Sequence, residues 1–226
     1  MRNKTLIVFD IDGTLTNSSK IHIQVFKESL RSLGLINYDS NFSNYKNITD
    51  SYILKRILDQ NNQEYSENLL NKFEDSQITR ISNFHVHEIS GARKLINILK
   101  KHPEYKICFT TGSLRKPAIF KLNAIKVDFD EQQLVASNYF FEREKIVKQA
   151  IRNAEKGNNN FQFKCIILIG DATWDLKAAH QLKLNFIGIG NKYKDVLMKE
   201  GCLYHFKDLS ETKILESIRT ITNTVT

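Results

Sequence analysis

Short apolar runs bounded by turn residues alternate, over most of the chain, with longer segments whose apolar residues recur every three to four positions. This alternation is typical of a parallel sheet with helices packed on its faces. The predicted strands cover residues 5–10, 105–111, 134–137, 164–170, 185–190 and 204–206. The predicted helices between them cover residues 91–101, 116–124, 143–154, 174–182, 193–200 and 210–221. The pattern therefore predicts an open α/β core.

Residues 17–88 break this alternation. Their periodicity predicts helices over residues 21–33, 49–60 and 67–81, with no convincing strand among them. We interpret this stretch as a helical insert that follows the first strand. The expected organisation is a core of residues 1–16 and 89–226, with a helical subdomain of residues 17–88. A surface loop is expected at residues 157–160.

The charge, cysteine content and hydropathy of the chain indicate which kinds of partner and compartment to expect. The chain has 226 residues and a formal net charge of +8, which would suit an acidic partner, but its Lys and Arg residues form no basic run. We therefore expect phosphorylated metabolites and no nucleic acid. The three cysteines form no CxxC pair, which favours buried free thiols in a cytoplasmic protein. No apolar segment approaches membrane-spanning length, so no membrane partner is expected, and the sequence leaves monomer and homodimer open.

Candidate chemistry begins where the first strand ends, in the string Asp10-Ile11-Asp12-Gly13-Thr14. Ligands of open parallel sheets bind beyond the carboxyl ends of the strands, so these acids stand where chemistry is usually done. An extended strand would point the two carboxylates to opposite sides, but Gly13 allows the chain to turn and bring them together. The alternative is that Asp-Gly serves only as a turn dipeptide.

A second acidic pair, Asp171 and Asp175, follows the predicted strand at residues 164–170. If the two strands are neighbours, up to four carboxylates gather, and like-charge repulsion would forbid this without a cation. Magnesium fits because it prefers oxygen ligands, and the cluster has no His or Cys that would favour zinc. Asp175 has two other interpretations: it favours the helix dipole, or it supports Asp171 or a metal-bound water.

Two further motifs carry features that suit a phosphate. The predicted strand at residues 105–111 ends in Thr110-Thr111-Gly112-Ser113, which offers hydroxyls and backbone amides before a helix, although such residues also serve as simple caps. Arg143 and Lys145 begin another predicted helix, where the dipole disfavours cations, and this placement indicates a function. A solvated surface is the alternative for each of the two cations.

In this order, the four motifs resemble those of the haloacid dehalogenase superfamily. The insert directly after the first motif resembles the helical, C1-type cap of the phosphoglycolate phosphatase-like branch, and the segment at residues 47–51 resembles part of that cap. The resemblance implies a Rossmann-like parallel sheet. In it the Asp10 strand is central, between the strands that end at Thr111 and Asp171.

The same resemblance implies a magnesium-dependent phosphatase that hydrolyses a small phosphorylated metabolite through an aspartyl phosphate. Asp10 is then the nucleophile and Asp12 the acid and base, while Asp171 completes the Mg²⁺ site with Asp10 and the Asp12 carbonyl. Thr111, with Gly112 after it, binds the phosphoryl group. The family usually has Lys at the basic position, and we assign it to Arg143 first and to Lys145 second. Magnesium would keep the pKa of Asp10 low, while Asp12 would hold a higher pKa.

Three other functions compete with this one. A dehalogenase of the superfamily would lack the second aspartate and need no metal, so Asp12 and Asp171 count against it. A phosphomutase would use the same acids, and a non-catalytic binding or regulatory protein would be expected to have lost one of them. The insert is expected to close over the site, hinging near residues 17–20 and 90–91, with Lys46, Asn47, Thr49 or Asp50 facing the substrate.

Overall fold

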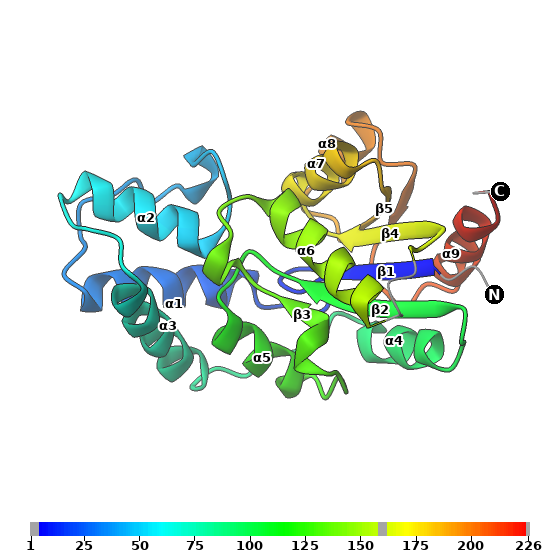
Figure 1. Cartoon of the computed structure of the whole chain (residues 1–226), viewed down its shortest axis with the longest axis horizontal. Coiled ribbons are helices and arrows are strands. Elements are labelled where there is room, and N and C mark those ends of the chain that lie inside the picture. The colour runs from blue at the N-terminus through cyan, green and yellow to red at the C-terminus, as the bar shows by residue number, and fades with distance from the viewer. Residues whose placement is uncertain (1–4, 158–161, 225–226) are drawn as a thin grey trace.

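The computed structural model describes residues 5–157 and 162–224. Within these residues the strands form one parallel sheet in the order β3-β2-β1-β4-β5-β6 (Figure 1). Their bounds are β1 Thr5–Asp10, β2 Tyr105–Thr110, β3 Leu134–Val135, β4 Cys165–Gly170, β5 Asn185–Ile189 and β6 Tyr204–Phe206. This confirms the predicted α/β core, with β1 at its centre.

The burial of β1 explains why it reads as a continuous apolar run. All six of its residues are buried. Ile7 and Phe9 pack into the cluster on one face of the sheet, and Leu6 and Val8 pack into the cluster on the other. A parallel strand covered on both faces needs apolar residues at every position, not at alternate ones.

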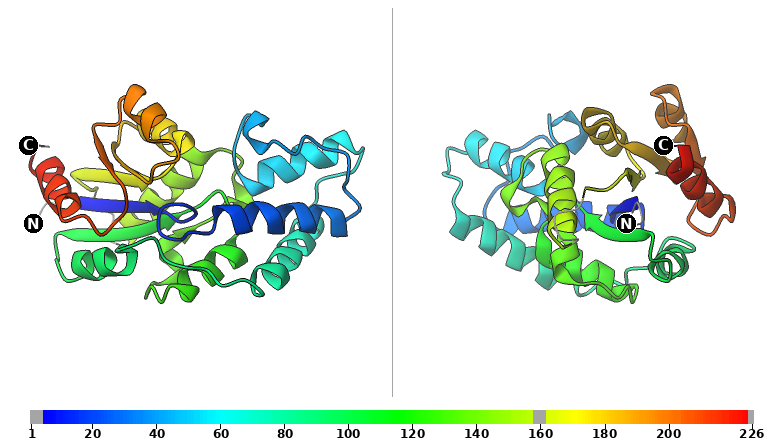
Figure 2. Two further views of the ribbon diagram at one scale, coloured as in Figure 1. Left: turned by 180° about the vertical axis from the view of Figure 1, so that it is seen from behind. Right: turned by 45° about the vertical axis from the view of Figure 1, so that its right-hand side comes forward.

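Helices cover both faces (Figure 2). α4, α5 and α9 pack on one face, and α6, α7 and α8 pack on the other. Their bounds are α4 Ala92–Lys100, α5 Arg115–Ala124, α6 Arg143–Lys156, α7 Thr173–Leu182, α8 Lys194–Lys199 and α9 Lys213–Thr224. The result is a three-layer core whose two apolar clusters are separated by the sheet.

The segment between β1 and α4 is helical, and it lies beyond the carboxyl end of β1 (Figure 1). Its elements are α1 Ser19–Ser32, the short 3₁₀ helix Phe42–Asn44, α2 Asp50–Gln60 and α3 Glu67–Ile81. These helices share an apolar cluster of their own, in which Phe26 and Phe73 meet edge to face with ring centroids 5.0 Å apart. We call this segment the insert.

The two connections between the insert and the core run side by side. The backbone N–H of Asn17 donates to the carbonyl of His87 at 2.9 Å, and that of Ile89 donates to the carbonyl of Leu15 at 2.8 Å. The chain therefore leaves the core and returns to it at the same place, which lies at the carboxyl end of β1.

Buried carboxylates dock the insert onto the core. Asp50 and Glu74 from the insert accept hydrogen bonds from the backbone N–H groups of Leu114, at 3.3 Å, and of Lys116, at 2.9 Å. These N–H groups lie in the first turn of α5 and just before it, where the N–H groups of a helix have no acceptor within the helix. Carboxylates from the insert thus cap a helix of the core.

The remaining differences from the predicted elements are small. The strand expected at residues 134–137 ends at Val135, because a 3₁₀ helix, Ser137–Tyr139, begins soon after it. Of the loop expected at residues 157–160, only Gly157 is among the described residues. The three cysteines are buried and free, as predicted. None of the described helices combines the length and the apolar character needed to cross a membrane.

Candidate active site

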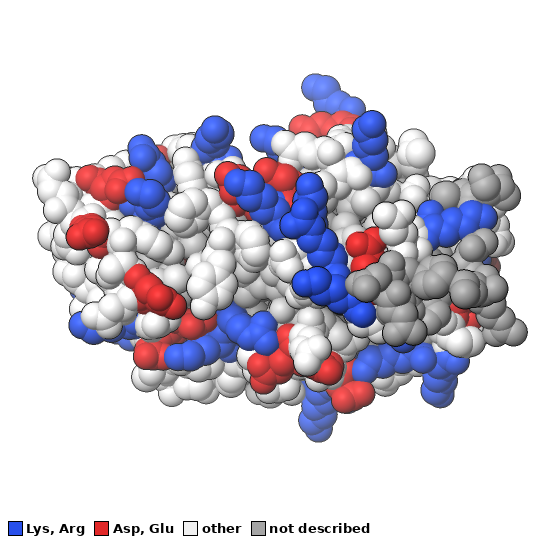
Figure 3. All heavy atoms as spheres, in the orientation of Figure 1, with Lys and Arg blue, Asp and Glu red and all other residues white. Residues whose placement is uncertain are grey.

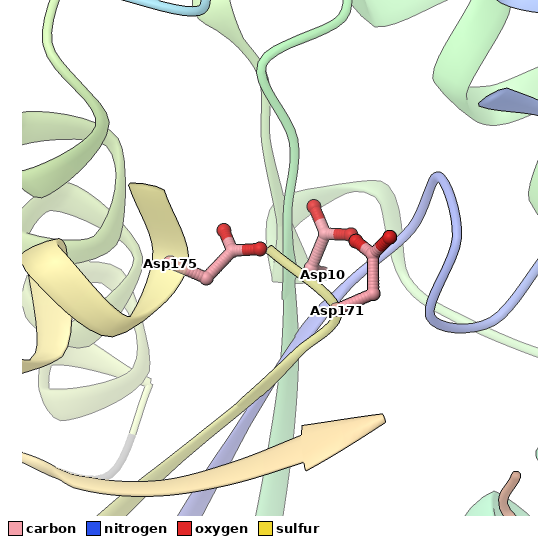
Figure 4. A group of neighbouring side chains, drawn as sticks. All are labelled: Asp10, Asp171 and Asp175. Atoms are coloured by element: carbon pink, nitrogen blue, oxygen red, sulfur yellow. The ribbon is translucent and has the colours of Figure 1, made fainter. Parts of the chain in front are cut away.

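Three acids from two motifs converge at the carboxyl edge of the sheet (Figure 4). β1 and β4 pair in parallel with Phe9 opposite Ile169, so Asp10 ends one strand beside the point where Asp171 follows the other. Asp175 approaches from the first turn of α7. One carboxylate oxygen of each of the three acids lies within 4.8 Å of those of the other two.

This approach requires glycine at two positions. Gly13 has φ +93°, and a Cβ at this position would lie 2.2 Å from Oδ2 of Asp171. A Cβ on Gly170 would lie 2.7 Å from the Asp175 side chain. Any larger residue at either position would therefore push an acid out of the cluster.

Arg143 is the cation of the cluster. It is buried at the start of α6, where its Nη2 bonds to Oδ1 of Asp10 and lies 2.8 Å from Oδ1 of Asp175. Its Nε donates to the same Asp175 oxygen at 2.9 Å. The other oxygen of Asp175, Oδ2, is buried and has no hydrogen-bond partner among the described residues.

One guanidinium does not neutralise three acids. Burial and the charges of Asp175 and Asp12 raise the pKa of Asp10 to about 7, although Arg143 acts to lower it. Burial, Asp10 and Asp175 likewise raise the pKa of Asp171 well above its usual value. The unpartnered Oδ2 of Asp175 and the absence of His or Cys from these three acids fit a hard divalent cation that prefers oxygen ligands.

Asp12 is not one of the three clustered acids. Its carboxylate lies 2.7 Å from Nζ of Lys121 and accepts a hydrogen bond from Ser18 at 2.5 Å. Burial acts to raise the pKa of Asp12, but Lys121, His22 and the hydrogen bond from Ser18 lower it to about 2. The expected higher pKa of Asp12 is therefore wrong for this arrangement, because a buried ammonium stabilises the carboxylate.

Thr111 and Gly112 line the cavity at the end of β2, as Arg143 does. The Thr111 hydroxyl lies 3.5 Å from Oδ2 of Asp12 and accepts the backbone N–H of Ser113 at 3.0 Å. A Cβ on Gly112 would lie 3.2 Å from a guanidinium nitrogen of Arg143.

Lys145 is not brought to this cluster. Its ammonium pairs with Glu142 at 3.0 Å, and 58% of its side chain is exposed. The geometry therefore corrects the second assignment of the phosphate-binding cation, and Arg143 alone of the two faces Asp10.

A cavity of about 450 Å³ lies between the core and the insert. Asp10, Asp12, Asp171 and Arg143 form part of its wall on the core side. Of the four insert residues expected to face a substrate, only Asp50 lines it. Thr49 instead donates its hydroxyl to the carbonyl of Phe141 at 2.9 Å, while Lys46 and Asn47 lie outside the lining.

Two residues beside Asp12 were not predicted from the sequence as site residues. Lys121 is completely buried on α5, and His22 lies on α1 with its Nδ1 3.3 Å from the Lys121 ammonium. The signal for Lys121 was available: it lies three and four positions after the buried Ala118 and Pro117 and next to Leu122, on the apolar face of its helix. A lysine there is rare unless it is paired. His22 carried no comparable signal.

Comparison with known proteins identifies the family. The model of the haloacid dehalogenase-like hydrolase family matches residues 7–189, which include all four motifs. The chain belongs to this family. No curated protein matches it. The haloacid dehalogenase-like assignment agrees with the sheet order and with the acids at the end of the central strand.

Solved structures share the whole fold at low identity. A hydrolase from Pseudomonas syringae is 21% identical, with a TM-score of 0.71 over 96% of this chain and 99% of that chain. A predicted phosphoglycolate phosphatase from Haemophilus somnus is 18% identical, with a TM-score of 0.64 over 96% and 99%. A β-phosphoglucomutase from Clostridium difficile is 20% identical, with a TM-score of 0.68 over 99% and 98%. The haloacid dehalogenase-like fold of the chain is thus similar to those of proteins named as phosphatases and as phosphomutases.

Proposed function

We propose that this haloacid dehalogenase-like hydrolase is a magnesium-dependent phosphatase, which hydrolyses a small phosphorylated metabolite through an aspartyl phosphate on Asp10. The observation that carries the proposal is the convergence of Asp10, Asp171 and Asp175 with Arg143, in a cluster of which Asp10, Asp171 and Arg143 line the cavity. Phosphoryl transfer needs positioning and charge neutralisation above all, and these groups supply both.

The reaction has two steps. In the first, the Asp10 carboxylate attacks phosphorus in line and the bond to the leaving oxygen breaks. Asp12, which its pKa of about 2 keeps ionised in the free protein, would take a proton from the entering phosphate monoanion and deliver it to that oxygen. In the second, Asp12 takes a proton from water as the water attacks the aspartyl phosphate, and passes it to the inorganic phosphate that is released, which restores both Asp10 and Asp12. Covalent catalysis and acid-base catalysis are thus divided between two acids two residues apart.

Charge is balanced by the surroundings of Asp10. Asp10, Asp171 and Asp175 would hold the Mg²⁺ ion, whose chemistry is to offset the charge of the carboxylates and of the phosphoryl oxygens. Because Nε and Nη2 of Arg143 contact Asp175 and Asp10, its Nη1, near Gly112, would bind a phosphoryl oxygen, while Thr111 and the backbone of Gly112 would provide further donors. The Asp12 carboxylate is not one of the three clustered acids and contacts Lys121 and Ser18, so it would be free of the metal ion and available for proton transfer.

The cavity favours a small anionic substrate. Its volume of about 450 Å³ lies at the low end of the range for small-molecule sites. Lys27 from the insert and Lys192 from the core line it, together with the rings of Phe42, Trp174 and Tyr193. These cations would attract a negatively charged leaving group, and the aromatic rings would pack against its apolar part.

The test is phosphate release from a panel of phosphorylated metabolites, with and without Mg²⁺. Wild-type protein should release phosphate only with the metal ion. Asp10→Asn should lose on the order of a million-fold in kcat, as for loss of a comparable nucleophile. Activity retained by Asp10→Asn, or no release from any compound, would contradict the proposal.

A phosphomutase is the second candidate, because it would use the same acids. Asp50 and Glu74 bind the insert to α5 through backbone N–H groups, and an insert held over the site would help to keep water from an aspartyl phosphate. The solved β-phosphoglucomutase of similar fold adds weight. Incubation with sugar monophosphates and catalytic sugar bisphosphate separates the two activities, because a mutase yields an isomer where a phosphatase yields free phosphate.

A further inference from the structure

Lys121 is buried without exposure to solvent, and its ammonium points at the carboxylate assigned to acid-base work. Its Nζ lies 2.7 Å and 2.8 Å from the two oxygens of Asp12, and 3.3 Å from both Oγ of Ser113 and Nδ1 of His22. An ammonium has three hydrogens to donate, and here each has an acceptor. A buried lysine is tolerated when it is paired in this way.

The contacts of Lys121 continue into the insert. Because an ammonium can only donate, Nδ1 of His22 accepts from Lys121 and Nε2 carries the ring hydrogen. That Nε2 lies 2.9 Å from Oδ1 of Asp50. The other oxygen of Asp50 accepts from Gln77 at 3.0 Å and from the backbone of Leu114 at 3.3 Å, so the end of this chain of contacts is fixed.

We propose that Lys121 is a positioning residue, which holds the Asp12 carboxylate in the orientation for proton transfer and is itself held by His22 and Asp50 of the insert. The proposal rests on the phosphatase function proposed above. Lys121 does not line the cavity, so its effect on the reaction passes through Asp12. Through His22, docking of the insert onto the core would then help to orient the Asp12 carboxylate.

The dependence of rate on the leaving group tests this role. The ratio kcat/KM reports the steps up to cleavage of the first phosphorus–oxygen bond, and an alkoxide leaving group needs a proton there, whereas p-nitrophenolate does not. Lys121→Met should lower kcat/KM about a hundred-fold for an alkyl phosphate and less than about ten-fold for p-nitrophenyl phosphate. Asp12→Asn should show the same asymmetry.

A double-mutant cycle separates a role through Asp12 from an independent one. If Lys121 acts by holding Asp12, adding Lys121→Met to Asp12→Asn should change kcat/KM by less than about three-fold. Lys148→Met, an exposed lysine of α6, is the matched control and should leave both substrates unaffected. Melting temperatures are measured for every variant, and Lys121→Gln, which keeps a donor without the charge, replaces Lys121→Met if the latter does not fold.

The outcomes are distinct. Equal losses on alkyl and aryl phosphates, or additive losses in the double variant, would overturn the positioning role while leaving the phosphatase function in place. The alkyl phosphate is one that the phosphate-release panel shows to be a substrate, and a wild-type protein inactive on the whole panel would overturn the phosphatase function, and the positioning role with it.

Discussion

At the scale of single residues, Arg143 and Lys145 show that the direction in which a side chain points from its helix decides whether it can act at the site. They are two positions apart on α6, and residues so spaced do not share a helix face. Arg143 turns inward to Asp10 and Asp175, which offsets the unfavourable placement of a cation at the start of a helix. Lys145 turns outward to Glu142. Their placement at a helix start indicated a function, but only the packing of α6 decides which cation has it.

Removal of each charge should separate the two residues. Arg143→Ala removes the guanidinium that neutralises Asp10 and binds the phosphoryl group, so kcat/KM should fall by about a hundred-fold to a thousand-fold. Lys145→Ala removes an exposed ion pair and should change it by less than about two-fold. Steady-state kinetics at saturating Mg²⁺ make the comparison, with melting temperatures to show that both variants fold. A larger loss from Lys145→Ala would restore the assignment that the geometry corrects.

At the scale of elements, the insert and α5 depend on each other. Glu74 on α3 is buried and accepts hydrogen bonds from the backbone of Lys116, at 2.9 Å, and from the side chain of Asn138, at 3.0 Å. The next residue, Asp75, makes only a surface ion pair with the Lys116 ammonium. Two neighbours on one helix thus make a buried and an exposed contact with the same residue of the core.

The two contacts should differ in free energy. Glu74→Ala leaves part-buried donors on Lys116 and Asn138 without their buried acceptor and should lower the free energy of unfolding by about 1–3 kcal/mol. Asp75→Ala should lower it by less than about 1 kcal/mol, because exposed ion pairs contribute little. Urea unfolding monitored by circular dichroism measures both. Equal effects would show that the buried contact does not dock the insert.

The helices and strands were largely predictable from the sequence, whereas the contacts that individual side chains make were not. β1 could be recognised because both of its faces are buried, and the carboxyl ends of parallel strands meet at one edge of a sheet, so Asp10 and Asp171 were expected to meet. The pairing of Asp12 with Lys121 was missed, since it joins residues 109 positions apart through the docking of α5. That pairing also reverses the expected pKa of Asp12, which depends on this neighbour.

At the scale of the whole molecule, charge is distributed unevenly. The chain carries a formal net charge of +8, yet three of its acids crowd one edge of the sheet. On the face shown in Figure 3, Lys and Arg lie among Asp and Glu, apart from a band of basic side chains over α6. The net positive charge therefore does nothing to relieve the repulsion inside the acidic cluster, which only groups close by can offset.

This repulsion makes the stability of the metal-free protein depend on pH. The pKa of Asp10 is raised to about 7 by burial, Asp175 and Asp12, and the pKa values of Asp171 and Asp175 are raised too. The folded state then binds more protons than the unfolded state from about pH 4 upward, so the free energy of unfolding falls as pH rises toward 7. Asp12, with a lowered pKa of about 2, acts in the opposite sense, and its contribution is lost only below about pH 4.

Magnesium should reverse this dependence. It binds the ionised carboxylates and so competes with protons, and a ligand of the folded state stabilises that state. The rise in melting temperature on adding Mg²⁺ should therefore be larger at about pH 8 than at about pH 5, with NaCl at matched ionic strength as the control. Asp10→Asn removes one of the titrating groups and should flatten the metal-free profile. A metal-free protein whose stability increases steadily from about pH 4 to 7, with no added stability from Mg²⁺ at higher pH, would mean that the three acids are not the site of a divalent cation.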